Sequence, residues 1–350
     1  MAAALRIIPA FGLGALGGWG AQVLGLPMPW LIGALLANAA WVMVLRPPRM
    51  ALPRPVHALF VSVIGVMIGG MFTPGLLSSL AGWWPGLVGV ILYTVLAQLG
   101  AFAIYHHLAG LDRATAYFAA SPGGFIENIN LGEEAGGDVA LLGLLQFLRV
   151  VMVLIAVPFG FAWWSGQAVG SAAGVTGAPG GPVATTAGDF ALLAVAALGG
   201  LTLGRVLRLP AGVLVGPVLL SAGLHLTGVL TVQPPSVAII IAQIVIGTGL
   251  GLRFSGLSPR QLRRGVAACS LALVFYLLLA FGFAAGLSLI TPYPMGTYVM
   301  SLVPAGVIEM SLVALTLGVN PVFVTTHHFI RILASVLVTP QIYARWVAKD

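Results

Sequence analysis

Charged residues are scarce in this chain. Only 7% of its 350 residues are Asp, Glu, Lys or Arg, whereas about a quarter of an ordinary soluble domain is charged. This shortage excludes a soluble enzyme. The 59% share of hydrophobic residues excludes a disordered chain, and collagen would require a strict glycine period. What the sequence does contain is long apolar runs, which predict a polytopic, all-helical membrane protein.

Metal-binding and thiol residues are also few. The single cysteine, Cys269, lies within an apolar run, so it cannot form an intrachain disulfide or a Cys-based metal cage, and we expect a buried free thiol. The six histidines stand singly or in neighbouring pairs, without a His-Glu motif. We therefore predict no metal, no cofactor and no enzyme activity.

The basic residues outnumber the acidic ones, 15 to 8, which gives a formal net charge of +7. They are spread over short loops and form no basic face, and no segment offers a DNA-binding domain. We therefore expect no direct contact with nucleic acid. The excess of basic residues indicates topology instead, because such residues collect in the cytoplasmic loops of membrane proteins.

Ten apolar segments are long enough to approach or exceed the roughly 20 residues that cross a bilayer as a helix. They are 7–25, 28–45, 56–73, 83–105, 139–162, 189–207, 211–229, 237–252, 266–290 and 321–343. Between the fourth and fifth span of each half lies a Gly-interrupted element, 112–136 or 296–318, for which we expect a re-entrant or broken helical hairpin. A linker rich in Gly, Ser and Thr, 163–188, separates the halves.

The two halves repeat one another in sequence. A shift of 182 positions, from Pro122 to Pro304, aligns 37 consecutive residues without a gap. Because charged residues are rare here, their recurrence in register is strong evidence of a duplication. The shift pairs Glu127 with Glu309 and Arg149 with Arg331.

The positions of the basic residues predict how repeat 1 (1–162) and repeat 2 (189–350) face the membrane. If each hairpin enters and leaves on one side, each repeat has five spans and the second repeat is inverted. Two of the 15 basic residues then lie within spans and the other 13 on the inner side. Hairpins that crossed completely would instead turn six of them outward. The positive-inside rule therefore favours ten spans, both termini in the cytoplasm and an external linker.

The hairpin tips and the spans that follow them form the candidate site. Half-helix N-termini at such tips offer N–H groups to an anion. Each following span begins at an N-cap, Asp138 or Asn320. Arg149 and Arg331 stand eleven residues further on, about 16 Å along the helix and thus near the bilayer centre. The candidate substrate- or ion-binding residues are Ser121, Pro122, Gly123, Gly124, Glu127, Asn128, Arg149, Pro304, Ala305, Gly306, Glu309, His327 and Arg331.

Two interpretations of these charges remain open. In one, the two arginines hold an anionic group of the substrate, while Glu127 and Glu309 bind a coupling proton or sodium ion. In the other, each glutamate only neutralises an arginine and locks the hairpin to the next span. His327 shares a helical face with Arg331 and either relays protons or makes an interior polar contact. Other intramembrane polar residues either line a path or bond across helices: Asn38, Gln98, Gln146 and Gln243.

A set of motifs follows the same order in both halves. They are Leu-Pro-x-Pro-Trp-Leu-x-Gly (Leu26–Gly33), Ser-Pro-Gly-Gly-Phe-Ile-Glu (Ser121–Glu127), Gly-Gly-Asp and Phe-Leu-Arg (Gly136–Arg149), Pro-Ala-Gly-Val-Ile-Glu (Pro304–Glu309) and His-His-Phe-Ile-Arg (His327–Arg331). In this order they resemble the AbrB-type family of bacterial membrane proteins, over essentially the whole chain. The second copy departs from the first, with Ala305 in place of Gly123 and Met310 in place of Asn128.

The resemblance implies a multi-pass protein of the bacterial inner membrane. Members of that family are commonly labelled regulators of gene expression or ammonia monooxygenases, and they are distinct from the small soluble DNA-binding proteins of the same name. The inverted five-span layout with a Gly-Gly hairpin is also similar to the sodium-coupled glutamate and citrate carriers. That likeness is architectural and names no substrate.

Three functions are therefore weighed. The first is a secondary transporter of a small anionic organic solute, coupled to protons or sodium by alternating access. The second is a membrane regulator that acts on gene expression indirectly, and the third is a monooxygenase, which lacks a metal constellation. The expected partners are the lipid bilayer and a small solute. Gly-rich spans also permit close packing, either within the chain or between the subunits of a homodimer.

Overall fold

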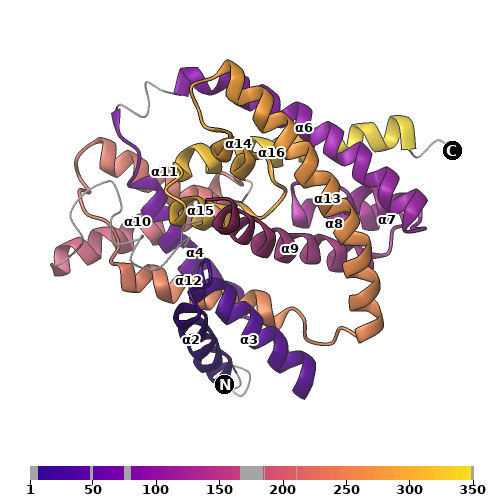
Figure 1. Cartoon of the computed structure of the whole chain (residues 1–350). Coiled ribbons are helices and arrows are strands. Elements are labelled where there is room, and N and C mark those ends of the chain that lie inside the picture. The colour runs from indigo at the N-terminus through magenta and orange to yellow at the C-terminus, as the bar shows by residue number, and fades with distance from the viewer. Residues whose placement is uncertain are drawn as a thin grey trace. The chain divides into compact units, whose positions relative to one another are not determined.

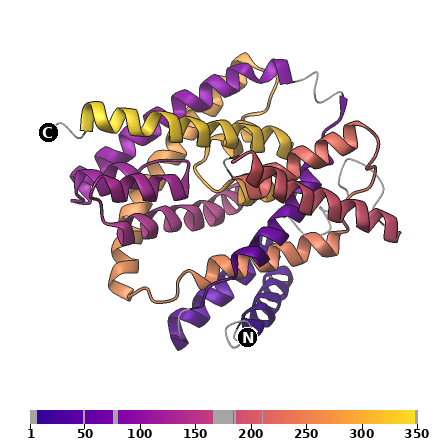
Figure 2. The same ribbon diagram turned by 180° about the vertical axis from the view of Figure 1, so that it is seen from behind.

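The computed structural model describes residues 7–47, 50–74, 80–165, 184, 186–209 and 211–347, apart from a few side chains within helices. This part of the chain contains fourteen α-helices and no β-strand. Figures 1 and 2 follow the helices in chain order from two opposite sides. Most of the predicted linker, 166–183, lies outside the described residues, as do Arg6, Arg49 and Lys349.

Every predicted span corresponds to a helix. The helices are α2 (Ile8–Val23), α3 (Pro29–Leu45), α4 (Arg54–Gly69), α6 (Trp84–Ala103), α9 (Val139–Ser165), α10 (Ala187–Val206), α11 (Gly212–Leu226), α12 (Ser236–Leu252), α13 (Pro259–Ile290) and α16 (Pro321–Ile342). Among the described residues, five helices are long and apolar enough to cross a membrane, namely α6, α9, α10, α13 and α16 with their short extensions. Length and composition thus agree with the expected apolar, all-helical protein.

Capping residues set where several of these helices begin. The Asp138 carboxylate accepts a hydrogen bond from the Leu141 N–H at 3.0 Å, which confirms the predicted start of α9. The Asn320 side chain accepts one from the Val322 N–H at 2.9 Å and caps α16 in the same way. For α13 the predicted start at 266 was wrong by seven residues, because a Ser258–Gln261 capping box extends the helix beyond its apolar part.

Both interrupted elements are helical hairpins, as expected. The first consists of α7 (Arg113–Ala119) and α8 (Phe125–Glu134), and the second of α14 (Met295–Leu302) and α15 (Val307–Thr316). We call the residues between the two arms the first tip (120–124) and the second tip (303–306). Gly124, the N-cap of α8, has φ +67°, a left-handed conformation that glycine adopts without strain.

The helices form two compact units, and each unit draws on both halves of the sequence. The first unit comprises Met1–Ser79, Pro158–Leu257 and Ser311–Val322, and the second Leu80–Val157, Ser258–Met310 and Phe323–Asp350. The first unit therefore contains the first three spans of each repeat. The second unit contains α6, α13, most of α9 and α16, and both hairpin tips. The hairpins divide differently, because Ser311–Thr316 of α15 belongs to the first unit whereas all of α8 (Phe125–Glu134) belongs to the second.

Within the first unit, helices of one repeat pack against helices of the other. A Cβ added to Gly251 of α12 would lie 2.6 Å from the Leu35 carbonyl oxygen of α3. A Cβ added to Gly69 of α4 would lie 2.5 Å from the Val218 carbonyl oxygen of α11. These two contacts are equivalent, since the repeat shift places Gly69 on Gly251 and, one position further, Leu35 on Val218. Glycine is needed at both because the backbones meet without room for a side chain.

The glycine-rich spans pack inside this unit as well. Gly17 of α2 lies against Gly33 of α3, and Gly200 of α10 lies against Gly216 of α11. Small residues therefore serve helix packing within the chain, and a homodimer stays a prediction.

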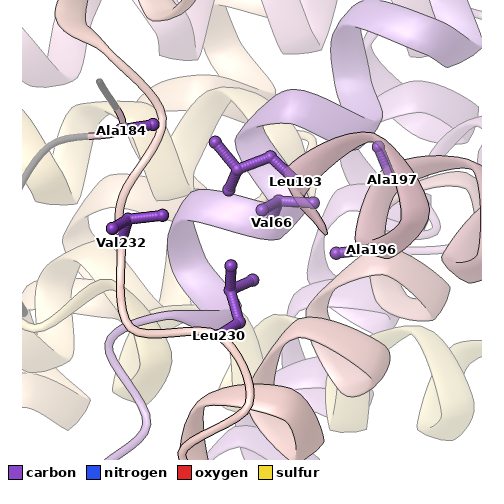
Figure 3. Packing of buried hydrophobic residues seen from close by; sticks show 7 residues of the cluster. All are labelled: Val66, Ala184, Leu193, Ala196, Ala197, Leu230 and Val232. Atoms are coloured by element: carbon purple, nitrogen blue, oxygen red, sulfur yellow. The ribbon is translucent and has the colours of Figure 1, made fainter. Parts of the chain in front are cut away.

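An apolar cluster in the same unit joins the two repeats a second time (Figure 3). Val66 of α4 belongs to repeat 1, and the other members belong to α10 and to the segments that precede α10 and α12. The cluster comprises Val66, Ala184, Leu193, Ala196, Ala197, Leu230 and Val232. Cross-repeat packing is thus a general feature of the first unit.

We expect Gly251→Ala to lower the melting temperature of the detergent-purified protein by several degrees, because overpacking costs about 1–3 kcal/mol. The matched control is Gly223→Ala in α11, where a Cβ would meet no atom within 4 Å. Alanine forms helix better than glycine, so the control should leave the melting temperature unchanged or raise it. Equal melting temperatures for the two variants would contradict the close α3–α12 contact.

Candidate functional site

All of the candidate site residues fall within the second unit. Both tips belong to it, together with Arg149, Arg331, Glu309 and His327. The side chain of Glu127 lies outside the described residues. The structure therefore gathers in one compact body the residues that two distant stretches of sequence contribute.

Side chains from three other helices satisfy the backbone carbonyls at the end of α7. The last carbonyls of an α-helix have no intrahelical partner, and burying them unpaired is unfavourable. Here Gln98 donates to Tyr117 O (2.5 Å), Gln146 to Phe118 O (2.7 Å), Tyr276 to Ala120 O (2.7 Å) and Arg149 Nη1 to Ser121 O. The guanidinium group also complements the negative end of the helix dipole.

The end of α14 is satisfied in a similar manner by α16. Arg331 donates through Nη1 to the carbonyls of Leu302 (3.3 Å) and Val303 (2.6 Å), and through Nη2 to that of Ala305 (2.6 Å). His328 Nε2 contacts Met300 O at 2.9 Å, so it must carry the proton. His328 Nδ1 is then the acceptor for Arg331 Nη2 at 3.0 Å.

The two sets of contacts are equivalent under the repeat shift. The bond from Arg149 to Ser121 O corresponds to the bond from Arg331 to Val303 O. Likewise, Gln146 on Phe118 O corresponds to His328 on Met300 O. Both arginines thus donate hydrogen bonds to hairpin carbonyls, and Arg331 also donates to the His328 ring. This capping role was not among the interpretations drawn from the sequence.

The helix α16 lies beside both tips. Its Arg331 side chain binds the second tip, while its backbone faces Gly123 of the first tip. A Cβ on Gly123 would lie 2.8 Å from Ser335 Oγ and 3.2 Å from both Arg331 O and Ile332 Cα. This close approach explains why the first tip has glycine at the position where the second has Ala305. Both tips therefore contact the same stretch of α16, and their meeting near the membrane midplane stays a prediction.

Glu309 lies at the N-terminus of α15. Its side chain is only 7% exposed, and a Cβ on Gly306 would collide with its carboxylate. A carboxylate in the first turn is favourable because it faces the positive end of the helix dipole. Glu309 therefore lies where the sequence predicted that a substrate anion would meet a half-helix.

His327 is a fully buried member of an aromatic cluster. Its Nδ1 donates to Phe323 O at 2.8 Å, and its ring stacks on that of Phe323 with centroids 4.0 Å apart. Trp83 and Tyr298 pack edge-on against the same phenylalanine. This is the interior polar contact weighed for His327, and a proton relay stays a prediction.

The sequence pointed to most of the carbonyl-binding side chains but missed Tyr276, and it did not point to Ser335, whose hydroxyl lies beside Gly123. Tyr276 lies in the middle of an apolar span, where nothing in the pattern separates it from a core residue. Ser335 stands four residues after Arg331, so helical spacing could have placed it on the same face. Cys269 is buried and free, as expected. The described residues contain no group of three metal-ligating side chains.

Apolar helices of membrane-crossing length, with two hairpins whose broken ends are capped by buried arginines, are the features of a helical membrane protein. The model of the family described as transition state regulatory protein AbrB matches residues 30–348. The chain belongs to the AbrB family.

Two relatives match almost end to end. The chain is 26% identical over 361 residues to the "Uncharacterized protein YhjN" of Bacillus subtilis (strain 168), which covers 95% of this chain and 90% of that protein. It is 26% identical over 326 residues to the "Putative regulator AbrB" of Escherichia coli (strain K12), covering 92% of this chain and 91% of the relative. The resemblance drawn from the motifs is thereby confirmed.

We expect Arg331→Lys to lower the melting temperature more than Arg149→Lys does. A lysine cannot reproduce the fork that serves three carbonyls, and each hydrogen bond to a charged group contributes about 1.5–3 kcal/mol. Arg149 serves one described carbonyl, which a lysine can still reach. Exposed Arg260→Lys is the control and should change nothing. The opposite order of the two buried variants would contradict the capping role.

Proposed function

We propose that this chain is a secondary transporter of a small anionic organic solute in the bacterial inner membrane, coupled to protons or sodium by alternating access. The observation that carries the proposal is that one compact unit contains both hairpin tips and the two arginines that bind them. Discontinuous helices at membrane depth are typical of transporters, where the broken ends face a substrate. In alternating access, the hairpin-bearing elements move around fixed scaffold helices.

The charge of the site supports an anionic solute. Arg149 is 4% exposed and Arg331 is 1% exposed, so two buried positive charges lie in the same unit. Two like charges in a buried site are costly unless a counter-charge balances them. An anion bound between the tips would supply that counter-charge.

The cross-repeat packing supports the inverted arrangement with ten spans. In the first unit, α3 contacts α12 while α4 contacts α11. The second span of each repeat therefore contacts the third span of the other repeat. Such an exchange is expected of two copies related by a two-fold axis. Together with the inside position of the basic residues, it favours an axis in the membrane plane and both termini in the cytoplasm.

The second candidate function is regulation of gene expression. The name of the matching family and that of the Escherichia coli relative favour it over transport. With its apolar composition the chain has no segment suited to reading DNA, so the effect would be indirect. Transport of a solute that cytoplasmic regulators sense would join both functions in one protein.

Thermal shift of the detergent-purified protein across small carboxylates, amino acids and sulfonates, with and without sodium and at two pH values, tests the transporter. We expect at least one anion to raise the melting temperature, by the linkage of binding to stability. Arg149→Ala and Glu127→Gln should reach the membrane but lose this response. Stabilisation that persists in both variants would contradict the site, and no stabilisation by any compound would favour the regulatory function.

Cysteine labelling of intact cells tests the topology. Because Cys269 is buried, the parent chain should react little with a membrane-impermeant maleimide. We expect Ser171→Cys in the linker to be labelled from outside and Arg260→Cys to be labelled only after the cells are opened. The reverse pattern would overturn the inverted, ten-span arrangement.

A further inference from the structure

Two amides at the first tip keep a buried oxygen without a partner. Asn128 donates its N–H groups to Gly123 O and, at 2.7 Å, to Gly124 O, and Gln146 donates to Phe118 O. These carbonyls fix the orientation of both amides, since a flip would set oxygen against oxygen. The atoms Asn128 Oδ1 and Gln146 Oε1 are buried and accept no hydrogen bond from a described residue.

Two buried donor groups beside the same tip are likewise unpartnered. They are the Nε–H group of Arg149 and the hydroxyl of Ser335. Folded proteins contain few buried polar atoms without a partner, and each one is unfavourable by about 1–3 kcal/mol. Four at a single tip therefore need an explanation.

These groups surround a segment of only four residues. Asn128 contacts Gly123 and Gly124, while Gln146 and Arg149 both contact Ser121 O. On the opposite side, Ser335 Oγ and the backbone of Arg331 lie against Gly123. Unpartnered acceptor atoms and unpartnered donor atoms therefore lie against the same short segment.

The second tip shows that the hairpin fold does not require these atoms. Under the repeat shift, Met310 occupies the position of Asn128, and Val153 that of Ser335. Neither side chain offers a hydrogen bond of comparable strength, yet the second hairpin forms the same two helices. His328, the counterpart of Gln146, has partners on both ring nitrogens. Of the two tips, only the first therefore has described amide oxygens without a partner.

We propose that the first tip selects a solute that carries both a carboxylate and an N–H or O–H donor, such as an α-amino acid or an α-hydroxy acid. The carboxylate accepts hydrogen bonds from the Arg149 Nε–H group and the Ser335 hydroxyl. The amino or hydroxyl group donates to Asn128 Oδ1 and Gln146 Oε1. This inference rests on the proposed function and names the substrate class of that site.

The chemistry of the acceptors requires the donor group on the solute. Amide oxygens repel a carboxylate, so a plain carboxylate would satisfy Arg149 and Ser335 and leave the Asn128 and Gln146 oxygens unpaired. Sites that hydrogen-bond a substrate N–H or O–H discriminate strongly against analogues that lack it. We expect the unsubstituted acid to bind at least about 100-fold more weakly than the amino or hydroxy acid of the same carbon skeleton.

Dose-dependent thermal shift of the full chain tests this with matched triplets, each an amino acid, a hydroxy acid and the unsubstituted acid of one skeleton. The key variant is Asn128→Met, which installs the residue of the second tip and so preserves a side chain that the hairpin tolerates. We expect it to abolish the preference for the donor-bearing acid while the plain acid still binds. Met310→Asn in the second tip is the matched control and should keep the preference.

Ser335→Ala gives an independent variant, should Asn128→Met fail to fold. It removes one donor to the carboxylate, so all three members of a triplet should bind more weakly while their ratio stays constant. Equal binding of plain and donor-bearing acids by the parent chain, or an unchanged ratio in Asn128→Met, would overturn the inference and leave the transporter standing. If no member of any triplet binds, the result contradicts both this inference and the proposed function.

Discussion

The arrangement of the second unit depends on one constraint: a helix that ends inside an apolar protein leaves carbonyl oxygens with no water to bind them. In both repeats, the equivalent arginine donates hydrogen bonds to such carbonyls. Arg149 donates to the first tip, and Arg331 to three carbonyls around the second. Five donors in a rigid fork and a permanent positive charge suit arginine to this task, because the end of a helix is also the negative end of its dipole.

This capping ties each hairpin to the span that follows it, and α16 then ties the two hairpins to each other. Gly123 fits against the backbone of α16 only because it has no side chain. Contacts to the backbone therefore hold the site together. The first unit uses the same device, since glycines let α3 approach α12 and α4 approach α11. The two helix contacts are equivalent because the two repeats are copies of one sequence.

The two tips differ in chemistry although they share a fold. Asn128, Gln146 and Ser335 add polar groups to the first tip beyond what the hairpin needs, whereas the apolar Met310 and Val153 stand at two of the equivalent positions of the second. An asymmetric solute, polar at one end, fits such a pair of tips better than a symmetric one. A solute of that kind also offers a physical link between the transporter that the geometry supports and the regulatory names of the family.

The sequence by itself determined the helices, the hairpins, the duplication and the family, because apolar runs, Pro-Gly breaks and rare charges in register are local signals. It also placed Arg149 and Arg331 in the candidate site. Only the tertiary structure decided what those arginines bind, since a carbonyl acceptor carries no mark in the sequence. It likewise decided that Glu309 covers the start of α15 and that Ser335 meets Gly123. Contacts between residues roughly 200 positions apart depend on how the repeats pack, which no local pattern specifies.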